Sequence, residues 1–189
     1  MATATDAKVW TWREALELPD GERFEVINGE LRERRLSFGS ASVAAILIEL
    51  LRQWARATAP GTVTGPDGGY TIFPWAAGDV RMPDVAYISR KRLPRVPRRG
   101  WVAVVPEFVA EVVSPNDRIT DAEDKAQDYI RAGVGLVWVV VPSTESVHVW
   151  RADGSRAVLR VGQRLTGEQV LPGFELPVAD LFAEFEPDD

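Results

Sequence analysis

Residues 108–141, FVAEVVSPNDRITDAEDKAQDYIRAGVGLVWVVV, decide the predicted fold of this chain. The stretch begins with an apolar run at 108–113, which is typical of a strand covered on both faces. It ends with an unbroken β-branched and aromatic run at 136–141, which predicts a central strand. Between them, Thr120 and Glu123 form a capping-box pattern that predicts the start of a helix. Strand, helix and strand in this order predict an α/β fold with a mixed central β-sheet flanked by helices.

Weaker patterns on both sides of this unit predict the remaining elements. Thr11 and Glu14 form another capping box, and Asn28-Gly29 predicts an added N-terminal hairpin. Asp153-Gly154 predicts a C-terminal β-hairpin, and apolar residues at helical spacing predict a long helix over 41–57. Further strands are expected at 69–73, 80–89 and 102–105, and a last short helix at 178–185.

Length and composition limit the class of protein. The 189 residues suit one domain, with a core at about 11–182 and a short acidic C-terminal tail. The absence of cysteine excludes disulfides, thiolate metal sites and a cysteine nucleophile, and the single histidine, His148, excludes multi-histidine zinc sites. With no long apolar span and no leader pattern, we expect a cytoplasmic protein without a membrane partner.

The charge balance requires any nucleic-acid partner to be held locally. The chain has 22 basic and 28 acidic residues, a net charge of −6, whereas proteins that bind nucleic acid by their overall field are basic. One basic stretch exists, RKRLPRVPRR at 90–99, and it is either a solvated, proline-stiffened loop or a nucleic-acid contact. Its six cations are Arg90, Lys91, Arg92, Arg95, Arg98 and Arg99.

Two carboxylates stand in predicted strands. Glu111 is flanked by apolar residues, and an isolated charge buried there would cost several kcal/mol unless it is paired, neutralised or bound to a cation. Asp84 follows Pro83 and precedes another apolar run. The alternatives are a water-exposed strand face for Glu111 and an ordinary turn at Asp84. Two acids on neighbouring strands, with oxygen ligands alone, suit Mg²⁺ or Mn²⁺ rather than zinc.

Lys125 is the third candidate. The chain has only three lysines against nineteen arginines, so lysine is not its usual cation. At helical spacing Lys125 lies beside Ala122 and Tyr129, at the border of the inward-facing stripe, where its ammonium group could reach the Glu111 strand. There it could orient a water molecule or stabilise charge developing on a phosphoryl group. The alternative is an ordinary helix-surface pair with Asp121 or Asp128.

Seven motifs occur in order from about Thr11 to Phe182. They are RFEVINGEL at 23–31, MPDVA at 82–86, FVAEVVSP at 108–115, KAQDY at 125–129, RAGV at 131–134, VWVV at 137–140 and LPGFELP at 171–177. In this combination the chain resembles the Uma2 (DUF820) family of endonucleases, part of the PD-(D/E)XK restriction-endonuclease-like superfamily. The resemblance implies a restriction-endonuclease-like core.

The resemblance also implies a phosphodiesterase site. By motif, Asp84 and Glu111 are the metal ligands, Lys125 assists the attacking water, and Glu25 is a further acid that orients the site, with Glu30 as a weaker substitute. Val113 stands where the superfamily lysine usually lies, and Lys125 matches the position to which Uma2-like sequences move it. The family's frequent histidine at the start of the long helix has no counterpart at 40–42.

We therefore expect a Mg²⁺- or Mn²⁺-dependent endonuclease acting on nucleic acid, with DNA preferred and a homodimer left open. One alternative is a non-catalytic nuclease-like module for binding or dimerisation, which would not need all four site residues. Another is a glycosidase with two carboxylates, which would need a wide aromatic cleft and no Lys125.

Overall fold

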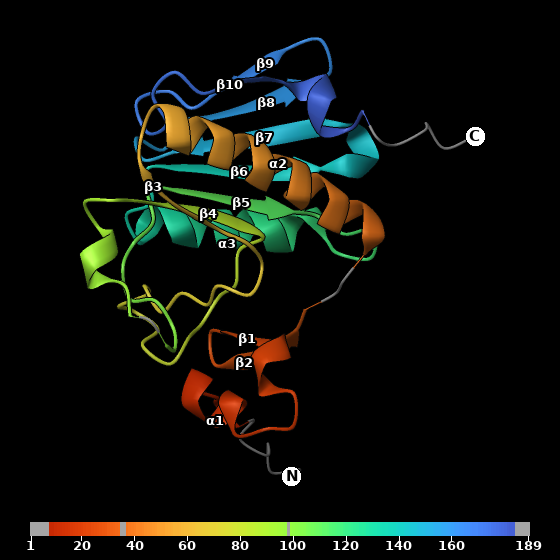
Figure 1. Ribbon diagram of the computed structural model, residues 1–189. Helices are drawn as coiled ribbons and strands as arrows, with labels where there is room; N and C mark the ends of the chain where they lie inside the picture. The colour runs from red at the N-terminus through yellow and green to blue at the C-terminus, as the bar shows by residue number, and fades with distance from the viewer. Residues whose placement is uncertain (1–7, 35–36, 98, 184–189) are drawn as a thin grey trace.

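The computed structural model describes residues 8–34, 37–97 and 99–183, so the predicted acidic tail and Arg98 lie outside the described residues. A six-stranded sheet forms its centre, in the order β3-β4-β5-β6-β7-β8 (Figure 1). Only β5 and β6 run parallel, joined by a helical crossover, and the other neighbours are antiparallel. The predicted mixed α/β sheet is thus confirmed. The strands are β3 (Gly61–Thr64), β4 (Val85–Ser89), β5 (Phe108–Val112), β6 (Leu136–Val141), β7 (Ser146–Arg151) and β8 (Arg156–Arg160).

Two helices cover the two faces of this sheet (Figure 1). The long helix α2 (Phe38–Ala57) buries Leu47 and Leu51 in one core, together with alternate side chains of the strands. On the other face, α3 (Ile119–Arg131) buries Ala126 and Tyr129 in a second core. All residues of β5 and β6 are buried because both faces are covered, as their apolar sequences predict.

The N-terminal residues form a small unit beside the sheet. It contains α1 (Trp12–Leu16), the 3₁₀ helix η1 (Gly21–Arg23) and the predicted hairpin of β1 (Phe24–Ile27) and β2 (Glu30–Glu33). The Thr11–Glu14 capping box forms as predicted. Asn28 and Gly29 both adopt positive φ in the turn, where the buried Asp79 carboxylate accepts their backbone N–H groups at 2.7 and 3.2 Å. This carboxylate connects the unit to the segment that leads into β4.

The expected strands before and between β4 and β5 are the main errors of the prediction. Instead of a strand at 69–73, Tyr70 forms isolated bridges with Arg81 and Val102, and the expected strand at 102–105 is reduced to that one bridge. The strand expected at 80–89 begins only at Val85, because Pro83 has no N–H to donate to a neighbouring strand.

Several boundaries also differ from the expectation. Helix α2 begins at Phe38, before residue 41, because Ser37 caps it, and α3 begins at Ile119 with no side-chain cap, so the Thr120–Glu123 box does not form. The predicted C-terminal hairpin is β7–β8, within the central sheet. The last helix is only a 3₁₀ turn. The remaining short elements are η2 (Leu93–Arg95), η3 (Pro142–Thr144), β9 (Arg164–Thr166), β10 (Glu175–Pro177) and η4 (Val178–Leu181).

No helix within the described part of the chain is both long and apolar enough to cross a bilayer.

Candidate active site

Asp84 and Glu111 lie at the same end of the central sheet. Strands β4 and β5 are antiparallel, with Val85 opposite Ala110, so one further step of this register places Asp84 opposite Glu111. Directly opposed residues of antiparallel strands point to the same face. The Asp84 carboxylate also accepts the backbone N–H of Val112 at 2.7 Å, which fixes it against the end of β5. Strand pairing thus brings together two acids that are 27 positions apart in the sequence.

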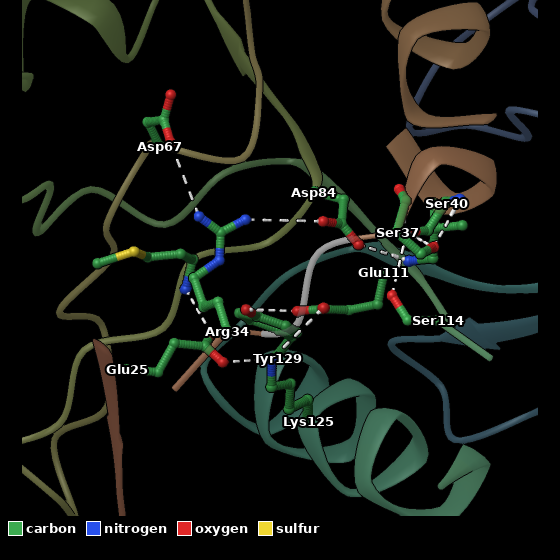
Figure 2. Close-up of polar contacts among 12 residues, drawn as sticks. Glu25, Arg34, Ser37, Ser40, Asp67, Asp84, Glu111, Ser114, Lys125 and Tyr129 are labelled. Carbon is green, nitrogen blue, oxygen red and sulfur yellow. Dashed lines mark hydrogen bonds and ion pairs between the residues drawn. The ribbon is translucent and has the colours of Figure 1, made fainter. Parts of the chain in front are cut away.

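Glu111 is a buried carboxylate with two partners on α3. Its exposed fraction is 6%, so the water-exposed strand face considered above is wrong. The Tyr129 hydroxyl donates to Glu111 Oε1 at 2.9 Å, and the Lys125 ammonium lies 3.5 Å from Oε2 (Figure 2). Lys125 and Tyr129 are four residues apart on the helix, so both face the strand.

Lys125 is held more tightly by an acid from the N-terminal hairpin. Its Nζ donates to Glu25 Oε2 at 2.6 Å, while Glu25 Oε1 accepts the backbone N–H of Met82 at 2.6 Å (Figure 2). Glu25 is therefore anchored on both oxygens. Glu30, the weaker candidate, is exposed and pairs with Arg32 at 2.9 Å. The structure brings Glu25, Asp84, Glu111 and Lys125 into one cluster and leaves Glu30 outside it.

Burial and mutual repulsion shift the protonation of this cluster. Burial, followed by repulsion from Asp84 and Glu25, raises the pKa of Glu111 to about 8, although Lys125 opposes the shift. Burial also raises the pKa of Asp84. Burial alone would lower the pKa of Lys125, but attraction to Glu111 and Glu25 outweighs it, so this pKa lies above its ordinary value. The amine therefore remains an ammonium ion at neutral pH.

Sequence reasoning missed two contributors to the cluster. Arg34 lies 3.9 Å from Asp84 Oδ1 and 3.7 Å from Asp67, and it has no motif that could have identified it. Tyr129 raised no suspicion beyond core packing, although its spacing from Lys125 was a usable signal. Burial, then the nearby carboxylates Glu111 and Glu25, raise the pKa of the Tyr129 hydroxyl well above its ordinary value, so it stays a donor. Figure 2 shows Arg34 and Tyr129 approaching the carboxylates from different elements.

A cleft of about 730 Å³ opens over these residues, with Glu25, Asp84, Glu111 and Lys125 among its lining. Within the described ranges, no three acidic or histidine side chains form a complete metal cage. Mg²⁺, however, is commonly held by one or two carboxylates with substrate phosphate and water as the other ligands. Asp84 and Glu111 supply such oxygen donors from adjacent strands of the sheet. The donor set therefore fits Mg²⁺ or Mn²⁺.

The basic stretch lies at the other end of the sheet. Asp84 immediately precedes β4, whereas Arg90 follows it, so six residue steps separate them by about 20 Å at 3.4 Å per residue. Arg92 has a structural role, since its guanidinium pairs with Glu107 at 3.0 Å and donates to the Val105 carbonyl. Lys91, Arg95 and Arg99 are exposed. The structure therefore does not bring these cations to the carboxylates.

Comparisons with known proteins indicate the family and the fold of the chain. Residues 12–179 match the Uma2 family, which is described as "Putative restriction endonuclease". A solved structure of "a putative nuclease belonging to DUF820" from Anabaena variabilis ATCC 29413 is similar, with a TM-score of 0.78 at 19% identity, covering 92% of this chain and 97% of that chain. No curated protein matches this sequence.

Proposed function

The chain belongs to the Uma2 family, with a restriction-endonuclease-like fold, and on this premise we propose that it is a metal-dependent endonuclease. The observation that supports this most is the convergence of Asp84 and Glu111 from paired strands, with Lys125 facing them 3.5 Å from Glu111. A glycosidase would not need that ammonium ion. A non-catalytic module would not need Glu25, Asp84, Glu111 and Lys125 to converge.

Asp84 and Glu111 would hold the metal ion. When bound, Mg²⁺ or Mn²⁺ polarises a phosphoryl oxygen and makes a bound water more acidic. In phosphodiester hydrolysis, a water oxygen bonds to phosphorus while the bond to the leaving sugar oxygen breaks, and negative charge builds up on the phosphoryl oxygens. The Lys125 ammonium can orient the water or stabilise this charge. Because two carboxylates keep Lys125 protonated, it acts as a donor rather than as a general base.

Glu25 and Tyr129 would be positioning residues. Glu25 holds Lys125 at 2.6 Å and is itself fixed by the Met82 N–H, so the ammonium is aimed before substrate arrives. The Tyr129 hydroxyl donates to Oε1 of Glu111 and so orients that carboxylate. Such preorganisation reduces the rearrangement required in the transition state.

We propose nucleic acid, and DNA first, as the substrate, in the cytoplasm. The exposed cations Arg90, Lys91, Arg95 and Arg99 would contact its backbone away from the cleft, with Arg98 as a further candidate outside the described residues. Arg92 would contribute less, because Glu107 and Val105 engage its guanidinium. Whether a homodimer forms would be measured by light scattering with and without DNA.

The test is nicking of supercoiled plasmid with Mg²⁺ or Mn²⁺. Asp84→Asn and Glu111→Gln are each expected to lower the rate at least about 100-fold, since each removes a charge at the reacting centre. Glu30→Gln is the matched control, because it removes an exposed acid of the same hairpin that holds Glu25 and should leave the rate unchanged. Undiminished cleavage by both site variants after identical purification would refute the proposal. If the wild-type protein binds but never cuts DNA or RNA, the non-catalytic module is the better description.

A further inference from the structure

A second groove, of about 490 Å³, lies between the C-terminal half of α2, strand β3 and the residues after β4. Three arginines line it, Arg52 and Arg56 from α2 and Arg90 from the basic stretch. No aspartate or glutamate is present among the described residues that form its wall. In a chain with a net charge of −6, this concentration of positive charge is unexpected.

The three arginines are placed at an electrostatic cost. Arg52 and Arg56 are four residues apart on one helix, where like charges repel. Neither Arg56 nor Arg90 has an ion-pair partner within the described part of the chain. One cation at the end of α2 would offset the helix dipole, which amounts to about half a negative charge. Three full charges exceed that need, so their convergence indicates an anionic ligand.

The groove is also fixed in shape. The Arg52 guanidinium donates to the carbonyl of Val63 on β3, at 3.4 Å, and the Arg90 backbone N–H donates to the Pro60 carbonyl at 2.9 Å. The first bond holds the Arg52 side chain against β3, and the second fixes the backbone of Arg90 beside the start of that strand. Arg52, Arg56 and Arg90 are all exposed residues, so a ligand can reach them without rearrangement of the core.

We propose that this groove binds phosphates of the nucleic-acid backbone as an exosite, separate from the cleft that contains Asp84 and Glu111. This inference rests on the proposed function for the choice of nucleic acid as the anion. Arginine suits the purpose because its planar guanidinium forms paired hydrogen bonds with phosphate oxygens.

The distance between the two sites predicts how substrate length matters. Ser40, near the start of α2, contacts Ser114 of the cleft wall at 3.0 Å, and Arg56 is sixteen residues further along the same helix. At 1.5 Å per residue this is about 24 Å. With one phosphate per 3.4 Å along a strand, about seven nucleotides separate the cleft from the groove. A short substrate could therefore occupy the cleft without reaching the exosite.

The experiment compares Arg52→Gln/Arg56→Gln/Arg90→Gln with wild type, using fluorescence anisotropy of a labelled DNA duplex of about 20 base pairs in chelator. Losing three phosphate contacts should reduce the slope of log K against log salt by about 2.7 and weaken binding at low salt at least about tenfold. Arg151→Gln/Arg160→Gln/Arg164→Gln is the control, because it removes the same charge from β7, β8 and β9. Thermal melting checks that both variants fold.

An unchanged salt slope and affinity in the groove variant, or an equal loss in the control, overturns the exosite. The same holds if inorganic phosphate binding is lost while duplex binding stays at the wild-type level, since the groove would then be a small-anion site.

The rate of cleavage provides a separate test. With the exosite correct, the groove variant loses more cleavage rate on the long duplex at low substrate concentration than on a hairpin with a stem of about six base pairs, and an equal loss on both substrates would contradict it. Binding that depends on the groove in a protein that never cuts would leave the exosite standing and reject the endonuclease.

Discussion

Replacing Glu111 by glutamine should make the protein more stable at neutral pH in the absence of metal. The folded protein raises the pKa of this carboxyl to about 8 by burial and by repulsion from Asp84 and Glu25, while the unfolded chain has the ordinary value near 4.5. Between these values the folded state binds one proton more than the unfolded state. The free energy of unfolding therefore falls as pH rises, by about 1.4 kcal/mol per pH unit. This contribution is complete below pH 4.5 and lost once pH has passed 8.

The loss of unfolding free energy can be calculated for a pH range in which the protein can be measured. From pH 5.5 to 7.5 the wild-type protein should lose up to about 2.7 kcal/mol relative to Glu111→Gln, which has the same shape and no charge to desolvate. Lys125 keeps its partner Glu25 at 2.6 Å in the variant, so the amine is not left unpaired. Asp84 titrates in both proteins and cancels from the difference to first order.

Urea unfolding with chelator at pH 5.5, 6.5 and 7.5 measures this difference, provided that the m-values agree. Glu30→Gln should follow the wild-type profile, because Glu30 is exposed. Parallel profiles for wild type and Glu111→Gln would show that Glu111 ionises normally, and the electrostatic description of the site would be wrong. Added Mg²⁺ should raise the stability of the wild type at pH 7.5 by mass action and leave Glu111→Gln unchanged.

Three further substitutions test separate contacts. Lys125→Ala should slow plasmid nicking by about 100-fold or more while the Mg²⁺ concentration for half-maximal rate changes little; loss of metal affinity alone would contradict its role. Arg81→Met should lower the free energy of unfolding in urea by about 3–5 kcal/mol, because Arg81 is fully buried and pairs with Asp128 at 2.6 Å and Asp79 at 3.6 Å. A loss below about 1 kcal/mol would mean that the two carboxylates do not depend on Arg81. Thr11→Ala should cost about 1 kcal/mol by removing the cap of α1, and an unchanged urea midpoint would show that the cap is dispensable.

Much of the site could be predicted because its residues violate local patterns. Glu111 is a carboxylate within an apolar strand, and Lys125 is one of only three lysines in a chain with nineteen arginines. Their proximity follows from the crossover, since α3 packs on the strands that it connects. The pairing of Glu25 with Lys125 could come only from the family resemblance, because the two residues are 100 positions apart and meet through the docking of the N-terminal hairpin.

The errors of the prediction have a different origin. The segments around Tyr70 and Val102 have strand-like composition, but single bridges to Arg81 and the Gly69 region replace continuous ladders there. Arg81 falls within the strand expected at 80–89, but the fold buries its guanidinium against the Phe73 ring at 4.3 Å. Such burial depends on which distant segments supply Asp79 and Asp128. Composition and periodicity contain no information about that choice.

The cleft that contains Asp84 and Glu111 and the arginine groove have opposite charges, which predicts different roles for the metal ion and the exosite. Among the described residues that line the cleft, eight are acidic and five are basic, so the cleft repels a phosphodiester until a divalent cation is present. The arginine groove has three cations and no acid among its described lining, and it attracts the same backbone without metal. Binding and cleavage should therefore separate: removal of metal should abolish cutting yet leave most of the salt-dependent affinity for long duplexes. A chelator that removes both together would place the main nucleic-acid contact in the cleft and reject this division.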